Sequence, residues 1–467
     1  MCARKNKFNW LMWAFTCCGN FTSILIILLT LSGCGNQTNV SKKLSEFDQN
    51  PSHYLNPNEP GLDISPAQQT ALAQDYLARY FSPWDAAEGS KKKMAGVLAQ
   101  YRMIFAGYKK HPGWGLNYKP LTTDFMQTLA DNANLAAFPN INQPGMIVNR
   151  SFVRSLPTKL PSFGNPQQAG EGFPFDNLQE SYVAKGSPVR ILHESKDKLW
   201  YLVLLSSFSG WVPSQDVGLV SPQFITQWKS WPFLIATKDN IPLTAANNLA
   251  PALMRVGVLY PSVPSTNPQQ YEVLLPFLDS KGNAQINQMF VDKTAAVQPF
   301  PLPLSAANVA AVTQSFIGTP YGWGGLYDQR DCSATTQDLF TSFGIWLPRN
   351  SGMQTSRGEV ISIAGLSREQ KFKIIEQRGI PYFTLIQAPG HIVLYIGMHN
   401  NVPYVLQDVW GLKTVNLLGK AGRIVIGKTV ITPLDFGQEY LNVRSFVDKT
   451  VKVIILKPEK LLKAKSS

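Results

Sequence analysis

The chain of 467 residues is poor in charged residues, histidine and cysteine. Charged side chains make up only 16% of it, which is low for a soluble cytoplasmic protein, whereas apolar residues make up 44% and suffice for several cores. The five histidines are dispersed, and neither a zinc-finger spacing nor a phosphate-binding glycine loop occurs. We therefore expect no metal and no cofactor.

The charge that is present is unbalanced. Lysine and arginine number 43 against 30 acidic residues, a formal net charge of +13. Such a surplus favours anionic partners such as nucleic acid, lipid headgroups or wall polymers. No basic run with interleaved aromatic residues occurs, so we expect no nucleic-acid partner.

The first 33 residues are typical of an export signal. A positive start at residues 4–7 precedes an apolar run at residues 24–29, which is too short to span a bilayer. The run ends in Leu-Ser-Gly-Cys, which resembles a bacterial lipobox, in which Cys34 is acylated and becomes the first mature residue. A retained signal anchor and an ordinary signal cut nearby are the alternatives. Gly35 favours a periplasm-facing outer-membrane anchor in a Gram-negative cell, and several acyl chains on one cysteine bind a membrane firmly.

Cysteine usage singles out one thiol. Once the signal is removed and Cys34 is acylated, the folded body keeps Cys332 alone and has no internal disulfide. The residue is either a buried small hydrophobe or a reactive group. The five cysteines of the chain are Cys2, Cys17, Cys18, Cys34 and Cys332.

The sequence predicts a multidomain protein. Helical periodicity dominates residues 66–136, and short alternating strands follow from about residue 173. The phrase Gly-Trp-Val-Pro at residues 210–213 resembles a bacterial SH3 domain, and a second such barrel is expected after it. The predicted parts are a signal (1–33), a tether (34–60), an N-terminal helical domain (61–165), two SH3-like β-barrels (166–222 and 223–300), an α+β domain (301–453) and a frayed basic tail (454–467).

The chemistry-bearing stretch lies in the last domain. A glycine-rich turn at residues 320–325 leads to Asp331 and Cys332, and an amphipathic helix continues to Phe343. Cys332 is therefore expected at a helix N-terminus. There the macrodipole and free N–H groups lower a thiol pKa and are able to stabilise a substrate oxyanion.

A thiolate nucleophile needs a base, and His391 is the best placed histidine. It follows Pro-Gly and opens the apolar strand 392–397, which puts it at a sheet edge facing a cleft. A third group normally orients the imidazole. Gln407 and Asp408 point to opposite faces of the next strand, and either is able to do so. A buried amide needs a partner, which favours Gln407.

Four separated motifs resemble the NlpC/P60 family of papain-like α+β cysteine peptidases. The likeness covers about residues 305–445, and the preceding parts resemble a subgroup with an N-terminal clip domain and two bacterial SH3 domains. The motifs are Tyr-Gly-Trp-Gly-Gly (321–325), Asp-Cys-Ser (331–333), Leu-Pro-Arg-Asn-Ser (347–351) and Gly-His-Ile-Val-Leu-Tyr-Ile-Gly (390–397).

The resemblance implies hydrolysis of the γ-D-glutamyl–diaminopimelate bond of peptidoglycan stem peptides. It also implies roles for single residues. Cys332 is the nucleophile, His391 the base and Gln407 the third member, at a position where relatives often carry histidine; the neutral amide predicts lower activity. Ala334 replaces a common glycine, which leaves Cys332 unaffected. The implied substrate-binding residues are Tyr321 near the thiol, Asp331 and Ser333 on the substrate backbone or its free amine, and Ser351 on the diaminopimelate side.

Three further functions remain open on the sequence alone. One is a recycling peptidase restricted to free stem peptides with an N-terminal L-Ala. In relatives, loops of the first SH3 domain make that choice, and residues 176–187 are the candidate loop here. Another is a non-catalytic wall-binding lipoprotein, and the last is acyl transfer or glutamine deamidation on the same fold. The expected partners are peptidoglycan or muropeptides and, through Cys34, a membrane; a monomer is expected.

Overall fold

A computed structural model describes residues 40–56, 62, 64–85, 89–245, 252–415, 418–438, 440, 443 and 445–463. The predicted signal, Cys34 and the start of the tether lie outside these residues. Of the described residues, 40–46 belong to one unit, and those from 47 to 463 belong to a second unit, which contains the three β-sheets. None of the described helices combines the length and the apolar character needed to cross a bilayer.

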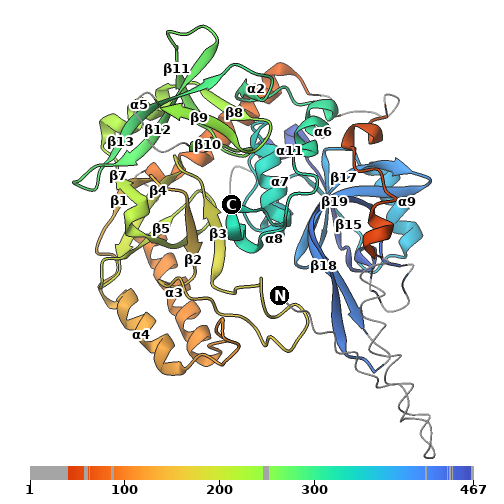
Figure 1. Cartoon of the computed structure of the whole chain (residues 1–467), viewed down its shortest axis with the longest axis horizontal. Coiled ribbons are helices and arrows are strands. Elements are labelled where there is room, and N and C mark those ends of the chain that lie inside the picture. The colour runs from red at the N-terminus through yellow and green to blue at the C-terminus, as the bar shows by residue number, and fades with distance from the viewer. Residues whose placement is uncertain are drawn as a thin grey trace, which may run out of the picture. The chain divides into compact units, whose positions relative to one another are not determined.

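Helices dominate the N-terminal part of the second unit, as predicted (Figure 1). Ser65 and Gln68 form a reciprocal capping box at the first helix, and Thr122 caps the third. Tyr101 and Met126 pack with Trp211 of the following sheet in one buried cluster. The helices are α2 (Pro66–Tyr80), α3 (Lys91–Lys110) and α4 (Thr123–Ala133), with 3-10 turns η1 (Pro51–Tyr54), η2 (Ser82–Trp84) and η4 (Leu135–Ala137).

The first sheet has its seven described strands in the order β3-β2-β6-β5-β4-β1-β7. Strands β1 and β2 pair with β4 and β6, so the domain begins before the predicted boundary between residues 165 and 166. Proline-rich spacing hid these two strands from sequence reasoning. The strands are β1 (Gln143–Ile147), β2 (Ser151–Arg154), β3 (Gln179–Val183), β4 (Pro188–Glu194), β5 (Trp200–Leu204), β6 (Ser209–Pro213) and β7 (Val217–Leu219).

A second antiparallel sheet occupies the segment predicted to form the second barrel. Helix α5 (Pro222–Ser230) leads into it, and its described strands run in the order β10-β9-β13-β12-β11-β8-β14. The strands are β8 (Phe233–Ala236), β9 (Ile241–Ala245), β10 (Ala252–Met254), β11 (Tyr260–Val263), β12 (Gln270–Leu278), β13 (Ala284–Asp292) and β14 (Val297–Pro299).

The last domain combines a sheet with helices, as the α+β prediction states. The sheet order is β15-β20-β16-β17-β18-β19, and α7 packs against β17 and β18. Its strands are β15 (Glu359–Ser362), β16 (Thr384–Ala388), β17 (His391–His399), β18 (Val402–Val415), β19 (Ala421–Pro433) and β20 (Lys452–Ile455). Its helices are α6 (Ala306–Gln314), η6 (Trp323–Asp328), α7 (Cys332–Thr341), α8 (Ser351–Gln354), α9 (Arg368–Arg378), α10 (Phe446–Lys449) and α11 (Pro458–Lys463).

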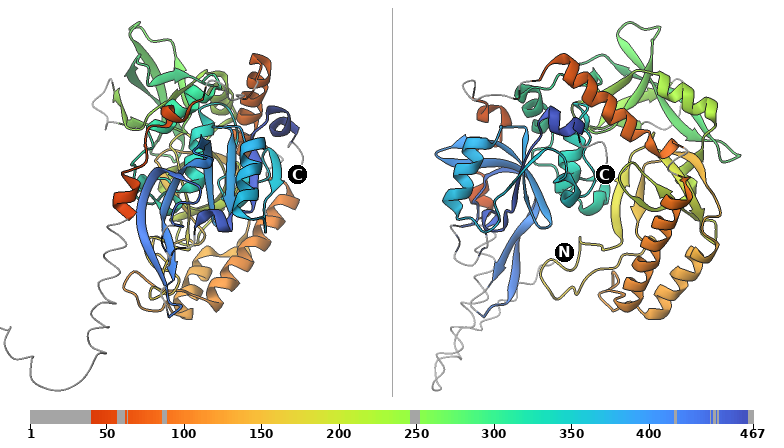
Figure 2. Two further views of the ribbon diagram at one scale, coloured as in Figure 1. Left: turned by 90° about the vertical axis from the view of Figure 1, so that its right-hand side faces the viewer. Right: turned by 180° about the vertical axis from the view of Figure 1, so that it is seen from behind.

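The predicted C-terminal end of this domain is wrong. Strand β20 lies between β15 and β16 inside the sheet, and Leu456 and Leu461 beyond it are fully buried, so the predicted tail is not frayed. Helix α11 lies beside α2, as the rear view in Figure 2 shows. Part of the predicted tether is also packed, because Gln49 exchanges two hydrogen bonds of 2.9 Å with the backbone of Ile431.

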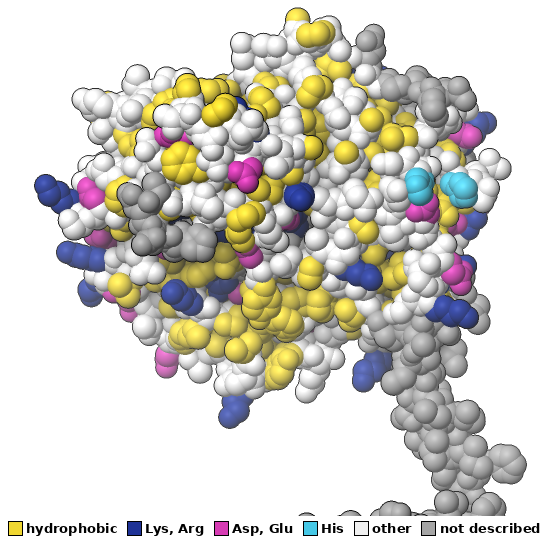
Figure 3. All heavy atoms as spheres, turned by 45° about the horizontal axis from the view of Figure 1, so that its top comes forward, with side chains coloured by type: hydrophobic (Ala, Val, Ile, Leu, Met, Phe, Trp, Pro, Cys, Tyr) yellow, Lys and Arg dark blue, Asp and Glu magenta, His cyan; other side chains and the backbone are white. Residues whose placement is uncertain are grey.

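Charge is thinly spread over the surface. On the face drawn in Figure 3, basic and acidic side chains are scattered and hydrophobic side chains lie between them. The basic surplus therefore forms no continuous patch on that face.

Candidate active site

Cys332 is the first residue of α7, as predicted. Asp331 precedes the helix in an extended conformation, and its Oδ1 accepts a 2.9 Å hydrogen bond from the backbone N–H of Ala334. The thiol lies close beneath the surface, with Cys332 8% exposed. The sulfur of Cys332 therefore lies at the N-terminus of α7.

His391 belongs to strand β17, against which the helix that carries Cys332 packs. It is the first residue of β17, directly after Gly390, whose φ of 79° allows the tight turn from β16. β17 pairs on both sides, so His391 marks the end of a strand rather than the predicted sheet edge. The backbone N–H of its neighbour Ile392 lies near enough to the sulfur of Cys332 to favour the thiolate. The helix start and the strand start therefore bring Cys332 and His391 together.

Gln407 on β18 holds the imidazole. Nε2 of His391 lies 3.0 Å from Oε1 of Gln407, and the Gln407 amide donates to Thr432 at 2.7 Å. Because Oε1 only accepts, Nε2 carries the proton, and Nδ1 is left as the basic nitrogen. Asp408 points away and accepts a 3.2 Å bond from Thr335 of α7. Of the two alternatives, the structure places Gln407 on the histidine.

The implied substrate residues are engaged within the protein. Arg349 donates from Nη1 to Oδ1 of Asp331 at 3.0 Å and from Nη2 to Oδ2 at 2.6 Å, a bidentate pair. Ser333 donates to Asp331 at 3.1 Å. Tyr321 packs against Trp410 with 6.0 Å between ring centroids. Ser351 begins α8, which contacts α7. Sequence reasoning placed Arg349 in a motif but missed its ion pair with Asp331.

Ion pairs connect the loop before Cys332 to the first and to the second β-sheet domain. Asp328 pairs with Arg150 next to the first sheet and with Arg255 next to the second. Arg330 pairs with Asp239 of the second sheet domain, and its Nε donates to Asp338 at 2.7 Å. The partners from the second sheet lie more than seventy residues away in the sequence, so no local pattern reveals them.

The first sheet domain also reaches the loop before Cys332. Nε1 of Trp323 donates to the carbonyl of Asp176 at 3.0 Å, and Gln179 donates to the carbonyl of Gly324 at 2.8 Å. A Cβ on Gly325, whose φ is 83°, would meet Tyr182 at 2.7 Å. The segment at residues 176–187 contains strand β3 and is not the predicted loop throughout, but it does lie against the residues that lead to Cys332.

Comparison with known proteins agrees with this geometry. Residues 318–404 match the model of the NlpC/P60 family. The chain carries an NlpC/P60 domain. Residues 161–213 match an SH3 domain of the SH3b1 type, and residues 23–138 match the N-terminal NLPC_P60 stabilising domain. Members of the NlpC/P60 family are cysteine peptidases.

Two relatives extend the likeness beyond the NlpC/P60 domain. The structure of an NlpC/P60 endopeptidase from Photobacterium damselae subsp. piscicida is 28% identical, with a TM-score of 0.79 over 88% of this chain and 97% of that one. The gamma-D-glutamyl-L-lysine dipeptidyl-peptidase of Bacillus cereus is 26% identical over 242 residues, which are 48% of this chain and 67% of that protein.

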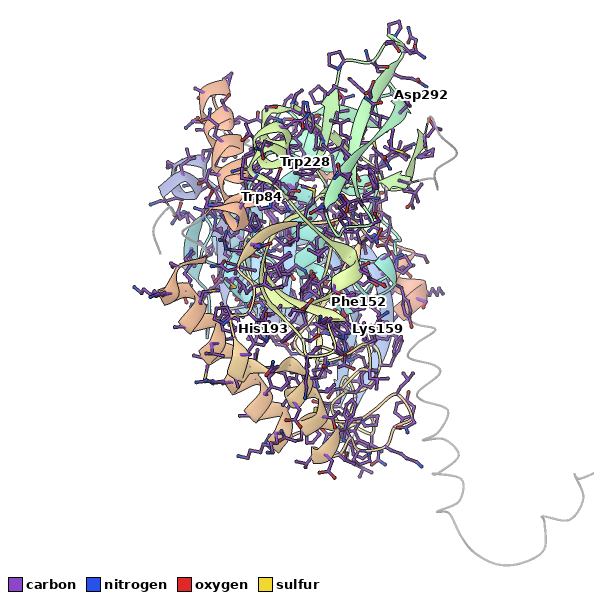
Figure 4. The ribbon with its side chains drawn as sticks, turned by 90° about the vertical axis from the view of Figure 1, so that its left-hand side faces the viewer. Trp84, Phe152, Lys159, His193, Trp228 and Asp292 are labelled. Atoms are coloured by element: carbon purple, nitrogen blue, oxygen red, sulfur yellow. The ribbon has the colours of Figure 1, made fainter. Side chains whose placement is uncertain are left out.

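Three of the four histidines other than His391 have surroundings typical of a structural role. His193, labelled in Figure 4, is buried on β4 of the first sheet, and its Nε2 lies 3.0 Å from the carbonyl of Ala133. His53 contacts Asp48, and His399 is exposed with its ring against Tyr404. Within the described residues, no group of three histidine, cysteine or acidic side chains is arranged to hold a metal ion.

The protonation state of the NlpC/P60 thiol differs from the prediction. Burial, together with the negative charge of Asp331, raises the pKa of Cys332 to about 12, although the N–H of Ile392 opposes this. Burial also lowers the pKa of His391 below its usual value of 6.5. Burial outweighs the helix N-terminus, so the resting pair is a neutral thiol beside a neutral imidazole.

This pair predicts the pH dependence of hydrolysis. If Cys332 is the nucleophile and His391 its base, the reactive form has His391 unprotonated and Cys332 protonated, so kcat/KM should rise with pH through an acid limb below pH 6.5. No alkaline limb should follow between pH 7 and about pH 10, because the thiol pKa is about 12. A pH–rate profile with a fluorogenic stem peptide measures both limbs. An alkaline limb near pH 8.5, the range of a free cysteine, would contradict the account.

The Gln407→Glu variant supplies the matched control for this profile. A carboxylate on Nε2 of His391 favours the charged imidazole, so the acid limb should move to higher pH by about one unit. A limb that does not move would show that Gln407 does not set the basicity of His391.

Proposed function

We propose that the protein is an envelope-anchored cysteine endopeptidase that hydrolyses the γ-D-glutamyl–diaminopimelate bond of peptidoglycan stem peptides. One observation carries the proposal: the contact of Cys332 with the start of β17, together with the 3.0 Å contact of His391 with Gln407. The family match at residues 318–404 supports the chemistry.

Cys332 and His391 carry out the steps of the proposed reaction. Nδ1 of His391 takes the thiol proton as the sulfur of Cys332 attacks the γ-carbonyl carbon of D-glutamate. The tetrahedral oxyanion collapses as His391 returns the proton to the leaving amine, which breaks the C–N bond. Water, deprotonated by His391, then hydrolyses the thioester and frees the thiol. N–H groups at the start of α7 are the donors available to the oxyanion.

The named relatives support a γ-D-glutamyl substrate. The Bacillus cereus relative is a gamma-D-glutamyl-L-lysine dipeptidyl-peptidase, which places D-glutamate on the acyl side and lysine at the next position. The Photobacterium protein, similar over most of both chains, is an NlpC/P60 endopeptidase. We propose diaminopimelate at the position of the lysine.

The location forms part of the same proposal. Acylation of Cys34 after removal of residues 1–33 would anchor the enzyme to the outer membrane, facing the periplasm. In the sequence, the two β-sheet domains, both proposed to be SH3-like, lie between the tether and the catalytic domain. Replacing Cys34 by alanine and following the protein into membrane and soluble fractions tests the anchor.

A second candidate is a recycling peptidase that accepts free stem peptides only. The observation in its favour is the contact of the first sheet with the loop before Cys332, through Asp176 and Gln179. A wall beside the nucleophile limits the size of what enters.

Substrate size separates the two candidates. An endopeptidase should hydrolyse a free tetrapeptide and a disaccharide tetrapeptide with kcat/KM values within about tenfold of each other, because a factor of ten corresponds to only about 1.4 kcal/mol. Purified mature protein and chromatographic separation of products measure the ratio. Activity confined to the free peptide would replace the first proposal by the second.

A further inference from the structure

Arg423 has no carboxylate partner among the described residues, although it lies close to the candidate active site. It is on β19 and stacks on Phe175, with 5.4 Å from the guanidinium carbon to the ring centroid. Phe175 contacts Trp410, and Trp410 contacts Tyr321, the tyrosine whose pKa the Cys332 thiol helps to raise. Arg423 and Tyr321 are near enough to interact electrostatically. The guanidinium thus borders the aromatic wall that leads to the nucleophile.

The donors of Arg423 are not used within the described part of the chain. Its Nε is buried and has no hydrogen-bond partner there, and no carboxylate lies within ion-pair distance. By contrast, Arg154, Arg330 and Arg349 each form an ion pair with a carboxylate. A buried guanidinium donor without an acceptor is costly unless a ligand supplies one.

The space around the guanidinium is shaped by a glycine. Gly170 has a φ of 87°, and a Cβ on it would lie 2.4 Å from Nη2 of Arg423. A larger residue there would push the side chain aside. The loop from the first SH3 domain and the β18–β19 hairpin therefore accommodate a guanidinium that faces no partner of its own among the described residues.

We propose that Arg423 binds a carboxylate of the substrate next to the scissile bond. This inference rests on the proposed function and adds a specificity-determining residue to it. Guanidinium groups prefer planar, bidentate carboxylates, and a stem peptide offers two near the cleavage point. One is the α-carboxylate of the γ-linked D-glutamate, and the other is the side-chain carboxylate of diaminopimelate.

Matched peptides and variants test the proposal. The substrates are the free L-Ala-γ-D-Glu-diaminopimelate-D-Ala peptide and two forms in which one or the other carboxylate is amidated. The enzymes are the wild type, Arg423→Gln, Arg423→Lys and Lys413→Gln. Lys413 pairs with Arg423 across the hairpin and is exposed, so its variant controls for loss of one positive charge on the same hairpin.

We expect Arg423→Gln to lower kcat/KM on the free peptide by about 10- to 100-fold, from the strength of a charged hydrogen bond. Arg423→Lys should lose less, and Lys413→Gln should match the wild type. Amidation of the recognised carboxylate should cost the wild type a similar factor and cost Arg423→Gln nothing, which also identifies which carboxylate is bound.

Three results would overturn the inference. They are a wild type indifferent to both amidations, an Arg423→Gln variant as active as the wild type, or an Arg423→Gln variant that loses as much activity as the wild type when the recognised carboxylate is amidated. The first of these results is measured on the wild type alone, so it tests the inference even if Arg423→Gln fails to fold. If the wild type cleaves none of the three peptides, the proposed function fails instead.

Discussion

Replacing Cys332 by alanine should abolish hydrolysis, with kcat reduced by roughly 10⁴-fold or more, as for loss of a nucleophile in other covalent peptidases. No other cysteine lies in the described part of the chain. Without the sulfur, His391 has no proton to take and no thioester forms. The measurement is turnover of a free stem peptide, compared with the wild type at equal concentration.

The same variant should remain folded. Alanine keeps the helix start at Asp331, and the substitution removes a single buried sulfur atom from the core. We expect a melting temperature within a few degrees of the wild type, because a change of about 1 kcal/mol shifts a large domain by only about 2–4 °C. Retained activity in a folded Cys332→Ala protein would mean that the residue is only a buried hydrophobe.

Removal of the chain after Val451 should prevent the catalytic domain from folding. The deletion takes away β20, which pairs with both β15 and β16, and with it the buried side chains of Val453, Ile454 and Ile455. Each buried aliphatic side chain contributes about 1.5–3 kcal/mol, so the loss is comparable to the whole stability of a domain, about 5–15 kcal/mol.

Circular dichroism in the near ultraviolet and thermal melting measure the effect. The matched control is a chain that ends at Lys463, which keeps β20 and α11 and should melt like the full protein. A cooperative transition at the wild-type temperature in the chain ending at Val451 would show that β20 is dispensable.

The sequence was most informative where the signal is local. The N-terminal position of Cys332 on its helix follows from a glycine-rich turn and a cap residue next to it in the chain. His391 at the start of a strand follows from Pro-Gly and an apolar run. The favoured partner Gln407 follows from strand periodicity and from the need of a buried amide for hydrogen bonds.

Long-range pairing accounts for what the sequence did not predict. A lysine-rich end suggested a frayed tail, but Lys452–Ile455 forms a strand whose two partner strands, β15 and β16, lie far upstream. The pairing of β1 and β2 with later strands, and the ion pairs of Asp328 and Arg330, join residues with no common local pattern. The pKa of Cys332 depended on burial, which no position along a helix reveals.

The most direct test of the account is mass spectrometry of the products from a defined muropeptide. If Cys332 attacks the γ-carbonyl of D-glutamate, the wild type should release a diaminopimelate-containing peptide with a free amino terminus. D-glutamate should remain on the other fragment, and Cys332→Ala should give neither product. Cleavage at a different bond, or the same products from Cys332→Ala, would contradict the account.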